Sequence, residues 1–358
     1  MASVRAIVLH RPAGMAAGPL ERWLADARHE RAERLVRRLA VAGATGGEIL
    51  VGEPDDTTFG ARIRAIVAGL GRESGLVVAG SGAAALATAH DLRPFVEIAA
   101  SGEARAIVNN RHSADLVAIG DPGVLGDVPD LPSDNALPRW LEEVAGVPVE
   151  EVRSRWRLAF DLDSPLDLLV AGLATPPDAA VAIDRLERVA EVLRDRRAEV
   201  LVAGRTSASA LRLLERKAAS RTRALVEERG LRASSRLALR AEDAGRPGRS
   251  VRAPASVLAM LLDDRGPGAL EAIAARLADA AVVDSRVLLA ARLGADERGW
   301  PRAEDRYASD LLLPDRIDDP WLRELTNAAR DAPIPILLGG HSLVGPGIRL
   351  LLRRTGAA

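Results

Sequence analysis

The sequence contains no cysteine, which excludes disulfide bonds, thiolate catalysis and metal sites built on cysteine. Aromatic residues make up only 3% of the 358 residues, so Ala, Val and Leu must fill the hydrophobic cores. No basic segment followed by an apolar run and a cleavage site opens the sequence. The longest uncharged stretch, Ser74 to His90, is shorter than the ~20 apolar residues of a membrane-spanning helix. We therefore expect a cytoplasmic protein with no membrane partner.

The formal net charge is −1, which argues against sequence-independent binding of nucleic acid. The charges are nevertheless unevenly distributed along the chain. Residues 115–167 hold 12 acidic and 4 basic side chains, and residues 205–252 hold 13 basic and 5 acidic ones. The acidic block could hold a metal ion and the basic block could face phosphates. Both blocks could equally be ordinary solvated surfaces.

Strand and helix patterns alternate in the first part of the chain. Apolar runs predict strands at residues 4–9, 48–51, 75–79, 104–108 and 115–119. Helical spacing predicts amphipathic helices around residues 20–39, 62–70 and 92–99, the last with Thr88 as its N-cap. Strands separated by helices predict an α/β fold with a mostly parallel sheet flanked by helices.

The alternation of strand and helix patterns resumes after a proline-rich segment. Residues 172–178 include two adjacent prolines, which cannot continue a helix, and we expect a linker there. The predicted domains are residues 1–173 and 178–358. The second shows a helix at 179–196, strands at 199–203 and 334–338, and an exposed loop at 244–254. We therefore expect a second α/β domain.

The segment Asp161-Leu-Asp163-Ser-Pro-Leu-Asp167-Leu is the most informative for chemistry. Asp161 and Asp163 would project from one side of an extended strand, so both could face one divalent cation. Ser164 can cap a following helix, Pro165 suits the first turn, and Asp167 favours the positive end of the helix dipole. The segment is therefore either a metal site or a well-capped helix start.

This segment resembles the D-[IL]-D-[ST]-P-x-D-L segment of GT-A type nucleotidyltransferases, such as 2-phospholactate guanylyltransferase and molybdenum cofactor guanylyltransferase. The resemblance covers roughly residues 1–170 and implies a nucleotide-diphospho-sugar transferase-like fold. It implies that Asp161 and Asp163 are the catalytic residues and the ligands of Mg²⁺. The implied reaction transfers a nucleotidyl group from a nucleoside triphosphate to a small phosphorylated or carboxylate acceptor.

Two other signatures of that family are altered. The glycine pair of its opening loop is absent from residues 8–18, and the magnesium-binding Asp after a later strand is replaced within residues 78–86. The residues of these loops that could still contact a nucleotide are Arg11, Gly14, Gly18, Gly80, Ser81 and Gly82. The alternative function is therefore a non-catalytic relative that binds a nucleotide or sugar phosphate at a degenerate site.

Two polar segments of the first domain have alternative interpretations. Asn109 and Asn110 could contact a base or sugar and Arg111 a phosphate, although Asn-Asn is also common in turns. Asp134-Asn135 could contact an acceptor or form the N-cap of a helix that carries Trp140.

The second domain contains two further candidate turns. A strand exit followed by a helix could bind an anion through free N–H groups, or could be an ordinary N-cap. The candidate residues are Gly204, Arg205, Thr206 and Ser207 in the first turn, and His341 and Ser342 in the second. These turns could hold an unrelated activity. Otherwise the second domain would supply the acceptor site or a dimer contact that makes the chain a homo-oligomer.

Overall fold

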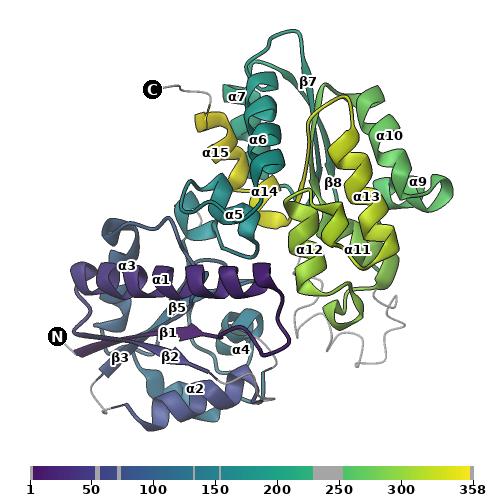
Figure 1. Cartoon of the computed structure of the whole chain (residues 1–358). Helices are drawn as coiled ribbons and strands as arrows, with labels where there is room; N and C mark the ends of the chain where they lie inside the picture. Colours follow the sequence, from purple (N-terminus) through teal and green to yellow (C-terminus); the bar gives the residue numbers. More distant parts are fainter. Residues whose placement is uncertain are drawn as a thin grey trace, which may run out of the picture. The chain divides into compact units, whose positions relative to one another are not determined.

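The computed structural model describes residues 3–52, 57–70, 74–131, 134–152, 155–228 and 253–354 (Figure 1). These residues form an α/β protein with one six-stranded mixed sheet and one four-stranded parallel sheet, which confirms the predicted class. Residues 3–15 and 25–161 group into a first unit, and residues 16–24, 162–228 and 253–354 into a second. The division at Asp161 precedes the predicted linker. The predicted loop at 244–254 lies almost wholly outside the described residues.

The first sheet has the strand order β2-β1-β3-β5-β4-β6. Its strands are β1 (Ser3–His10), β2 (Gly46–Val51), β3 (Ser74–Gly80), β4 (Ala106–Val108), β5 (Leu116–Ile119) and β6 (Val149–Glu151). Strand β1 pairs in parallel with β2 and β3, and β4 pairs in parallel with β6, whereas β5 is antiparallel to β3 and β4. Residues 109–115 are too few for a crossover, so β4 and β5 form a hairpin.

Helices cover both faces of this sheet. Helices α1 (Pro19–Ala42) and α3 (Ala89–Ala99) pack on one face through a core that includes Leu35 and Phe95. Helices α2 (Phe59–Ala68) and α4 (Leu137–Glu143) pack on the other through Ile63 and Trp140. Figure 1 shows α1 and α3 on the side of the sheet opposite to α2. Short 3-10 helices span Pro122–Asp127, Asp134–Ala136 and Trp156–Ala159.

Two predicted helix caps of the first unit have different outcomes. Thr88 caps α3 in a capping box with Asp91, as predicted. The predicted cap of α4 by Asp134 or Asn135 is wrong, because its N-cap is Ala136, which makes no side-chain cap. The Asp134 carboxylate instead accepts the N–H of Asn135, and Pro138 removes one donor from the first turn. Trp140 is buried, as expected for the helix.

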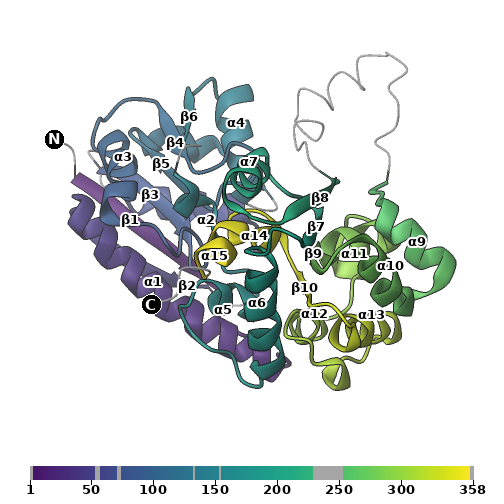
Figure 2. The same ribbon diagram turned by 90° about the horizontal axis from the view of Figure 1, so that it is seen from above.

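The second sheet is entirely parallel, with the order β10-β9-β7-β8. Its strands are β7 (Glu199–Gly204), β8 (Arg221–Val226), β9 (Ala280–Asp284) and β10 (Ile336–Gly339). Figures 1 and 2 show α6, α7 and α15 on one side of these strands and α9, α10 and α13 on the other. Such two-sided covering is typical of parallel sheets.

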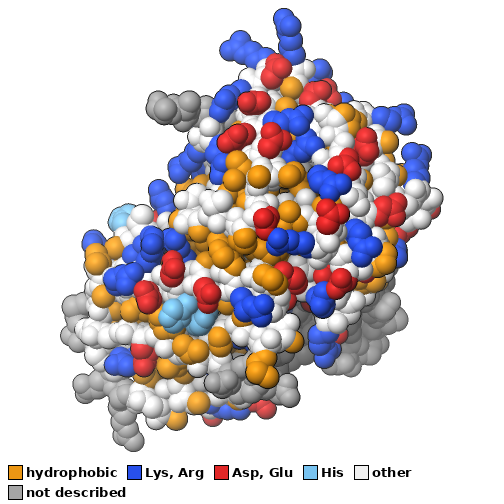
Figure 3. Space-filling view, in the orientation of Figure 1, with side chains coloured by type: hydrophobic (Ala, Val, Ile, Leu, Met, Phe, Trp, Pro, Cys, Tyr) orange, Lys and Arg blue, Asp and Glu red, His pale blue; other side chains and the backbone are white. Residues whose placement is uncertain are grey.

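The helices of the second unit precede, separate and follow its strands along the chain. They are α5 (Pro165–Val170), α6 (Ala180–Val192), α7 (Ala208–Lys217), α9 (Val257–Arg265), α10 (Leu270–Leu277), α11 (Ser285–Leu293), α12 (Ala303–Asp310), α13 (Pro320–Asp331), α14 (His341–Val344) and α15 (Gly347–Arg354). Short 3-10 helices span Pro267–Ala269, Glu297–Gly299 and Pro314–Arg316. Across the described ranges, no helix combines the length and the hydrophobicity that a bilayer crossing requires. On the face drawn in Figure 3, basic and acidic side chains are intermixed.

Candidate functional site

The strand order fixes one special position in each sheet. Ligands of open α/β sheets bind at the carboxyl ends of strands, between neighbours whose following connections run in opposite directions. In the first sheet the chain moves from β1 to β2 on one side and then returns to β3 on the other. In the second sheet it moves from β7 to β8 and then returns to β9. The candidate sites are therefore the β1/β3 and β7/β9 carboxyl ends.

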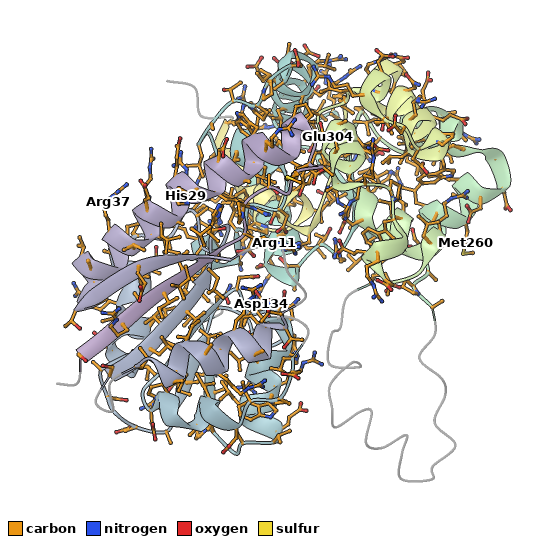
Figure 4. All side chains as sticks on the ribbon, turned by 60° about the horizontal axis from the view of Figure 1, so that its bottom comes forward. Arg11, His29, Arg37, Asp134, Met260 and Glu304 are labelled. Carbon is orange, nitrogen blue, oxygen red and sulfur yellow. The ribbon has the colours of Figure 1, made fainter. Side chains whose placement is uncertain are left out.

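At the β1/β3 position, a hydrogen bond joins the side chains of His10 and Ser81. The distance from His10 Nδ1 to Ser81 Oγ is 3.1 Å, and both residues are buried. Burial lowers the pKa of His10, and neighbouring His29 and Arg28 lower it further, so His10 is neutral at pH 7. The rings of His10 and His29 are 4.9 Å apart, and His29 is labelled in Figure 4. A neutral, hydrogen-bonded histidine therefore marks the end of β1.

The turn after β3 is strained and partly open. Ala84 is buried with a φ of 47°, a conformation that costs a residue with a Cβ about 1–2 kcal/mol. The main-chain N–H of Ala84 donates to Asp161 Oδ1 at 3.4 Å, which helps to hold this turn. A Cβ placed on Gly80 would meet no atom within 4 Å, so space is available beside it. The structure thus brings Asp161 and the Gly80 turn together.

The polar segment at 109–111 has mainly internal partners. Asn109 Oδ1 accepts the N–H groups of Asp115 and Leu116 at 3.2 Å each, and its Nδ2 donates to the Leu158 carbonyl at 3.0 Å. Asn109 therefore shapes the β4–β5 turn. Asn110 accepts the N–H of His112. Arg111 lies 3.0 Å from Glu142 and donates to the Val149 carbonyl at 2.6 Å, so it is directed to α4 and β6.

The candidate ligand-binding residues of the opening loop belong to both units. Arg11 is exposed in the loop after β1, in the first unit (Figure 4). Gly14 also belongs to the first unit, and a Cβ there would meet nothing within 4 Å. Gly18 belongs to the second unit, and a Cβ there would lie 2.2 Å from the Glu304 carboxyl group. Gly18 is therefore required by packing against Glu304.

The acidic segment is divided at Asp161. Asp161 belongs to the first unit, and Asp163 and Asp167 belong to the second. Ser164 is the N-cap of α5, as predicted, and Asp167 accepts the N–H groups of Asp163 at 2.9 Å and of Ser164 at 2.7 Å. The ring of His341 lies with Nδ1 3.4 Å from Asp163 Oδ2.

Whether this segment can bind a cation depends on the side chains that it offers as ligands. Mg²⁺ binds through one or two carboxylates together with substrate phosphates. Of the predicted pair, the first unit contains Asp161. Within the described ranges, no group of three or more His, Asp or Glu side chains could hold a metal ion. A cation beside Asp161 would therefore take its remaining ligands from phosphates brought by a ligand.

At the β7/β9 position, Arg205 and Asp284 form a two-pronged ion pair. Arg205 Nε lies 2.7 Å from Oδ2 and Nη2 lies 3.1 Å from Oδ1 of Asp284, whose side chain is fully buried. Burial opposes the charged form of Arg205, but the Asp284 carboxylate outweighs it and the pKa of Arg205 is raised. Gly204 has a φ of 118°, and a Cβ there would lie 2.3 Å from Asp284 Cβ. Glycine is therefore needed for this pair to form.

A second buried ion pair, between Arg286 and Asp310, lies near the first. Arg286 Nη1 and Nη2 donate to the two carboxylate oxygens of Asp310 at 2.7 and 2.6 Å. Arg286 Nη1 is also 2.9 Å from Ser285 Oγ, which donates to the Gly339 carbonyl of β10 at 3.2 Å. Burial alone would lower the pKa of Arg286, but the Asp310 carboxylate raises it. This network connects the carboxyl ends of β9 and β10.

The charge of Asp310 also acts on the buried carboxyl group of Asp167 in α5. Burial raises its pKa to about 8, the negative charges of Asp163 and Asp310 add to that rise, and the N–H groups of Ser164 and Asp163 oppose it. Asp167 is therefore mainly protonated at neutral pH.

Sequence reasoning identified the glycine turns but missed Asp284 and Arg286. Asp284 ends a short strand that follows an Ala-rich helix, so the pattern did not separate the two elements. A carboxylate immediately before a Ser-initiated helix was the available signal. The pairing of Arg286 with Asp310, 24 residues later, had no local signal.

No family model matches the chain, and neither a curated protein nor a solved structure matches it. The functional argument therefore depends on the sites themselves.

Proposed function

We propose that the first unit binds a nucleoside phosphate at the carboxyl ends of β1 and β3. The observation that carries this proposal is the His10–Ser81 hydrogen bond across the position where such sheets bind ligands. The nucleotide itself is taken from the resemblance of the segment that begins at Asp161.

Three features support phosphate binding here. Gly80 leaves room for a ligand to approach the backbone closely. Arg11 is an exposed cation in the loop that follows β1. Neutral His10 fixes the Ser81 hydroxyl by a hydrogen bond without adding charge, so Ser81 is oriented before a ligand arrives. Binding would therefore combine one charge with oriented hydrogen-bonding groups.

Nucleotidyl transfer is the second candidate, favoured by the contact between Asp161 and the Ala84 N–H. Asp161, the first carboxylate of the acidic motif, would then lie beside the proposed phosphate site. An acceptor oxygen would attack the α-phosphorus, a new P–O bond would form, and the bond to pyrophosphate would break. The residues of this chain would contribute positioning and charge.

The test is thermal stabilisation of the full chain by ATP, GTP, CTP and UTP, with and without Mg²⁺. We expect at least one nucleotide to raise the melting temperature, because a ligand that binds only the folded state stabilises it. Arg11→Ala and Gly80→Ala should weaken the response. Arg37→Ala, an exposed change on α1 (Figure 4), and Gly126→Ala, where a Cβ also meets nothing within 4 Å, are the matched controls.

Each outcome decides between the candidates. Stabilisation without Mg²⁺ that survives in Asp161→Asn supports binding alone. Stabilisation that requires Mg²⁺ and disappears in Asp161→Asn, with pyrophosphate released in the presence of an acceptor, supports transfer. No response to any of the nucleotides, or equal losses in the control variants, would overturn both candidates.

A further inference from the structure

The second unit carries a group of side chains that the proposed function does not use. His341 follows the Gly339-Gly340 exit of β10, and its ring nitrogen lies 3.4 Å from the Asp163 carboxylate. Both side chains reach solvent, with exposed fractions of 38% for His341 and 51% for Asp163. A Cβ on Gly340 would meet nothing within 4 Å. A polar, accessible pair therefore stands beside open space.

Arg205 lies in the same group at the end of β7, and the charge of Asp163 acts on it. Its Nε and Nη2 bind Asp284, whereas Nη1 has no hydrogen-bond partner among the residues that the structure describes. The side chain is 32% exposed. Asp284 thus fixes the guanidinium plane while one edge keeps N–H groups for another acceptor. A guanidinium edge of this kind suits a carboxylate or phosphate.

Thr206 provides an independent observation. Its side chain is 1% exposed, and its Oγ1 has no hydrogen-bond partner within the described part of the chain. A buried hydroxyl without a partner costs stability, so such groups call for an explanation. Thr206 follows Arg205 directly and lies one residue before the N-cap of α7. The hydroxyl oxygen is enclosed, so a ligand would become its partner only through an adjustment of this turn.

The charges of this group are mostly paired. Asp284 is compensated by Arg205 and Asp310 by Arg286. Helices α7 and α11 both begin at this end of the sheet, and helix N-termini favour negative charge. The remaining negative charge, on Asp163, faces His341.

We propose that the carboxyl ends of β7, β9 and β10 form a second ligand site, which binds a small hydroxylated molecule through its oxyanion. Arg205 and the Thr206 turn hold the carboxylate or phosphate, and the His341–Asp163 pair holds a neighbouring hydroxyl group. The site lies within the second unit and does not depend on nucleotide binding by the first.

The test is calorimetric titration and thermal shift of the full chain with glycerol phosphate, glycerate, inorganic phosphate and glycerol. We expect glycerol phosphate or glycerate to bind more tightly than inorganic phosphate, and glycerol not to bind. Comparison of the two hydroxylated anions distinguishes a phosphate from a carboxylate ligand. His341→Gln and Arg205→Lys should each weaken binding at least tenfold.

Thr206→Val is the most specific test of the proposed site, because it removes only the buried hydroxyl. We expect it to raise the melting temperature of the free protein and to weaken ligand binding. Ser220→Ala removes another buried hydroxyl without a described partner, outside this group at the start of β8, and should raise the melting temperature while leaving binding unchanged. Absence of binding by every anion, or equal binding by wild type, Thr206→Val and His341→Gln, would overturn the proposal.

Discussion

The carboxylate of Glu304 accepts the main-chain N–H of Leu20 at 3.0 Å, although the two residues are 284 positions apart. The same carboxylate accepts the N–H of Glu21 at 3.1 Å. Glu304 thus supplies from α12 the acceptor that the N-terminus of α1 needs (Figure 4). The negative charge also suits the positive end of the helix dipole.

Glu304→Ala should lower the free energy of unfolding by about 1–2 kcal/mol, the usual cost of a lost helix cap. Glu304→Gln keeps an acceptor but loses the charge, so its cost should be smaller. Urea denaturation measures both, with the exposed Glu215→Ala change on α7 as control. Equal stabilities of Glu304→Ala and the control would contradict the capping role.

The buried pair of Arg286 and Asp310 leads to a second prediction. The exposed fractions of their side chains are 11% and 0%. Arg286→Met or Asp310→Asn should each cost about 3–5 kcal/mol, because the remaining partner keeps polar or charged groups buried without compensation. The double variant should cost less than the sum. Arg298→Ala, which removes an exposed partner of Asp296, should change stability little. Additive effects in the double variant would show that the pair is not coupled.

The strands that sequence patterns predicted share a continuous apolar run. Strands β1, β3 and β7 are buried along most of their length, so hydrophobicity alone identifies them. Strand β8 was missed because it is an edge strand whose residues are mostly exposed and include Arg221 and Arg223. Strand β9 was missed because its Ala-Ala-Val-Val run continues the composition of helix α10. Hydrophobic periodicity does not report whether a strand lies at a sheet edge or where a helix of similar composition ends, so neither strand was predicted.

The candidate sites were predictable to a similar extent. Glycines and polar residues directly after buried strands indicated the turns at Gly80 and Gly204. At Gly80 the missing side chain leaves open space, and at Gly204 it avoids a clash with Asp284. The partners of these turns could not be predicted, because His10–Ser81 and Arg205–Asp284 join residues 71 and 79 positions apart. Such pairs exist only after the sheet has ordered its strands.

The raised pKa of Asp167 predicts a pH-dependent stability. In the unfolded chain this carboxyl has its ordinary pKa of 3.8, whereas burial raises the pKa in the folded protein to about 8. Between these values the folded state binds more protons, so stability falls as pH rises, by up to about 1.4 kcal/mol per pH unit. The contribution is complete below the unfolded pKa and is lost as pH passes the folded one.

Asp167→Asn should remove this dependence while keeping an oxygen that accepts from Asp163 and Ser164. Urea unfolding of wild type and variant from about pH 5 to about pH 9 measures the difference across the relevant window. The variant should gain stability relative to wild type as pH rises. Parallel pH profiles would show that Asp167 is ionised in the folded protein throughout this range.

The left-handed backbone at Gly204 gives the last prediction. Its φ is 118°, and an added Cβ would lie 2.3 Å from Asp284 Cβ, which the backbone of β9 holds in place. Gly204→Ala should therefore lower the free energy of unfolding by about 1–3 kcal/mol from backbone strain, with the overlap at Asp284 adding to it. Gly299→Ala, where a Cβ meets nothing within 4 Å, should have little effect. Because the displaced Asp284 also orients Arg205, Gly204→Ala should weaken anion binding in the second unit beyond its effect on stability, as titration of the folded variant at low temperature would measure. A Gly204→Ala variant as stable as Gly299→Ala would mean that β7 and β9 separate more easily than this packing implies.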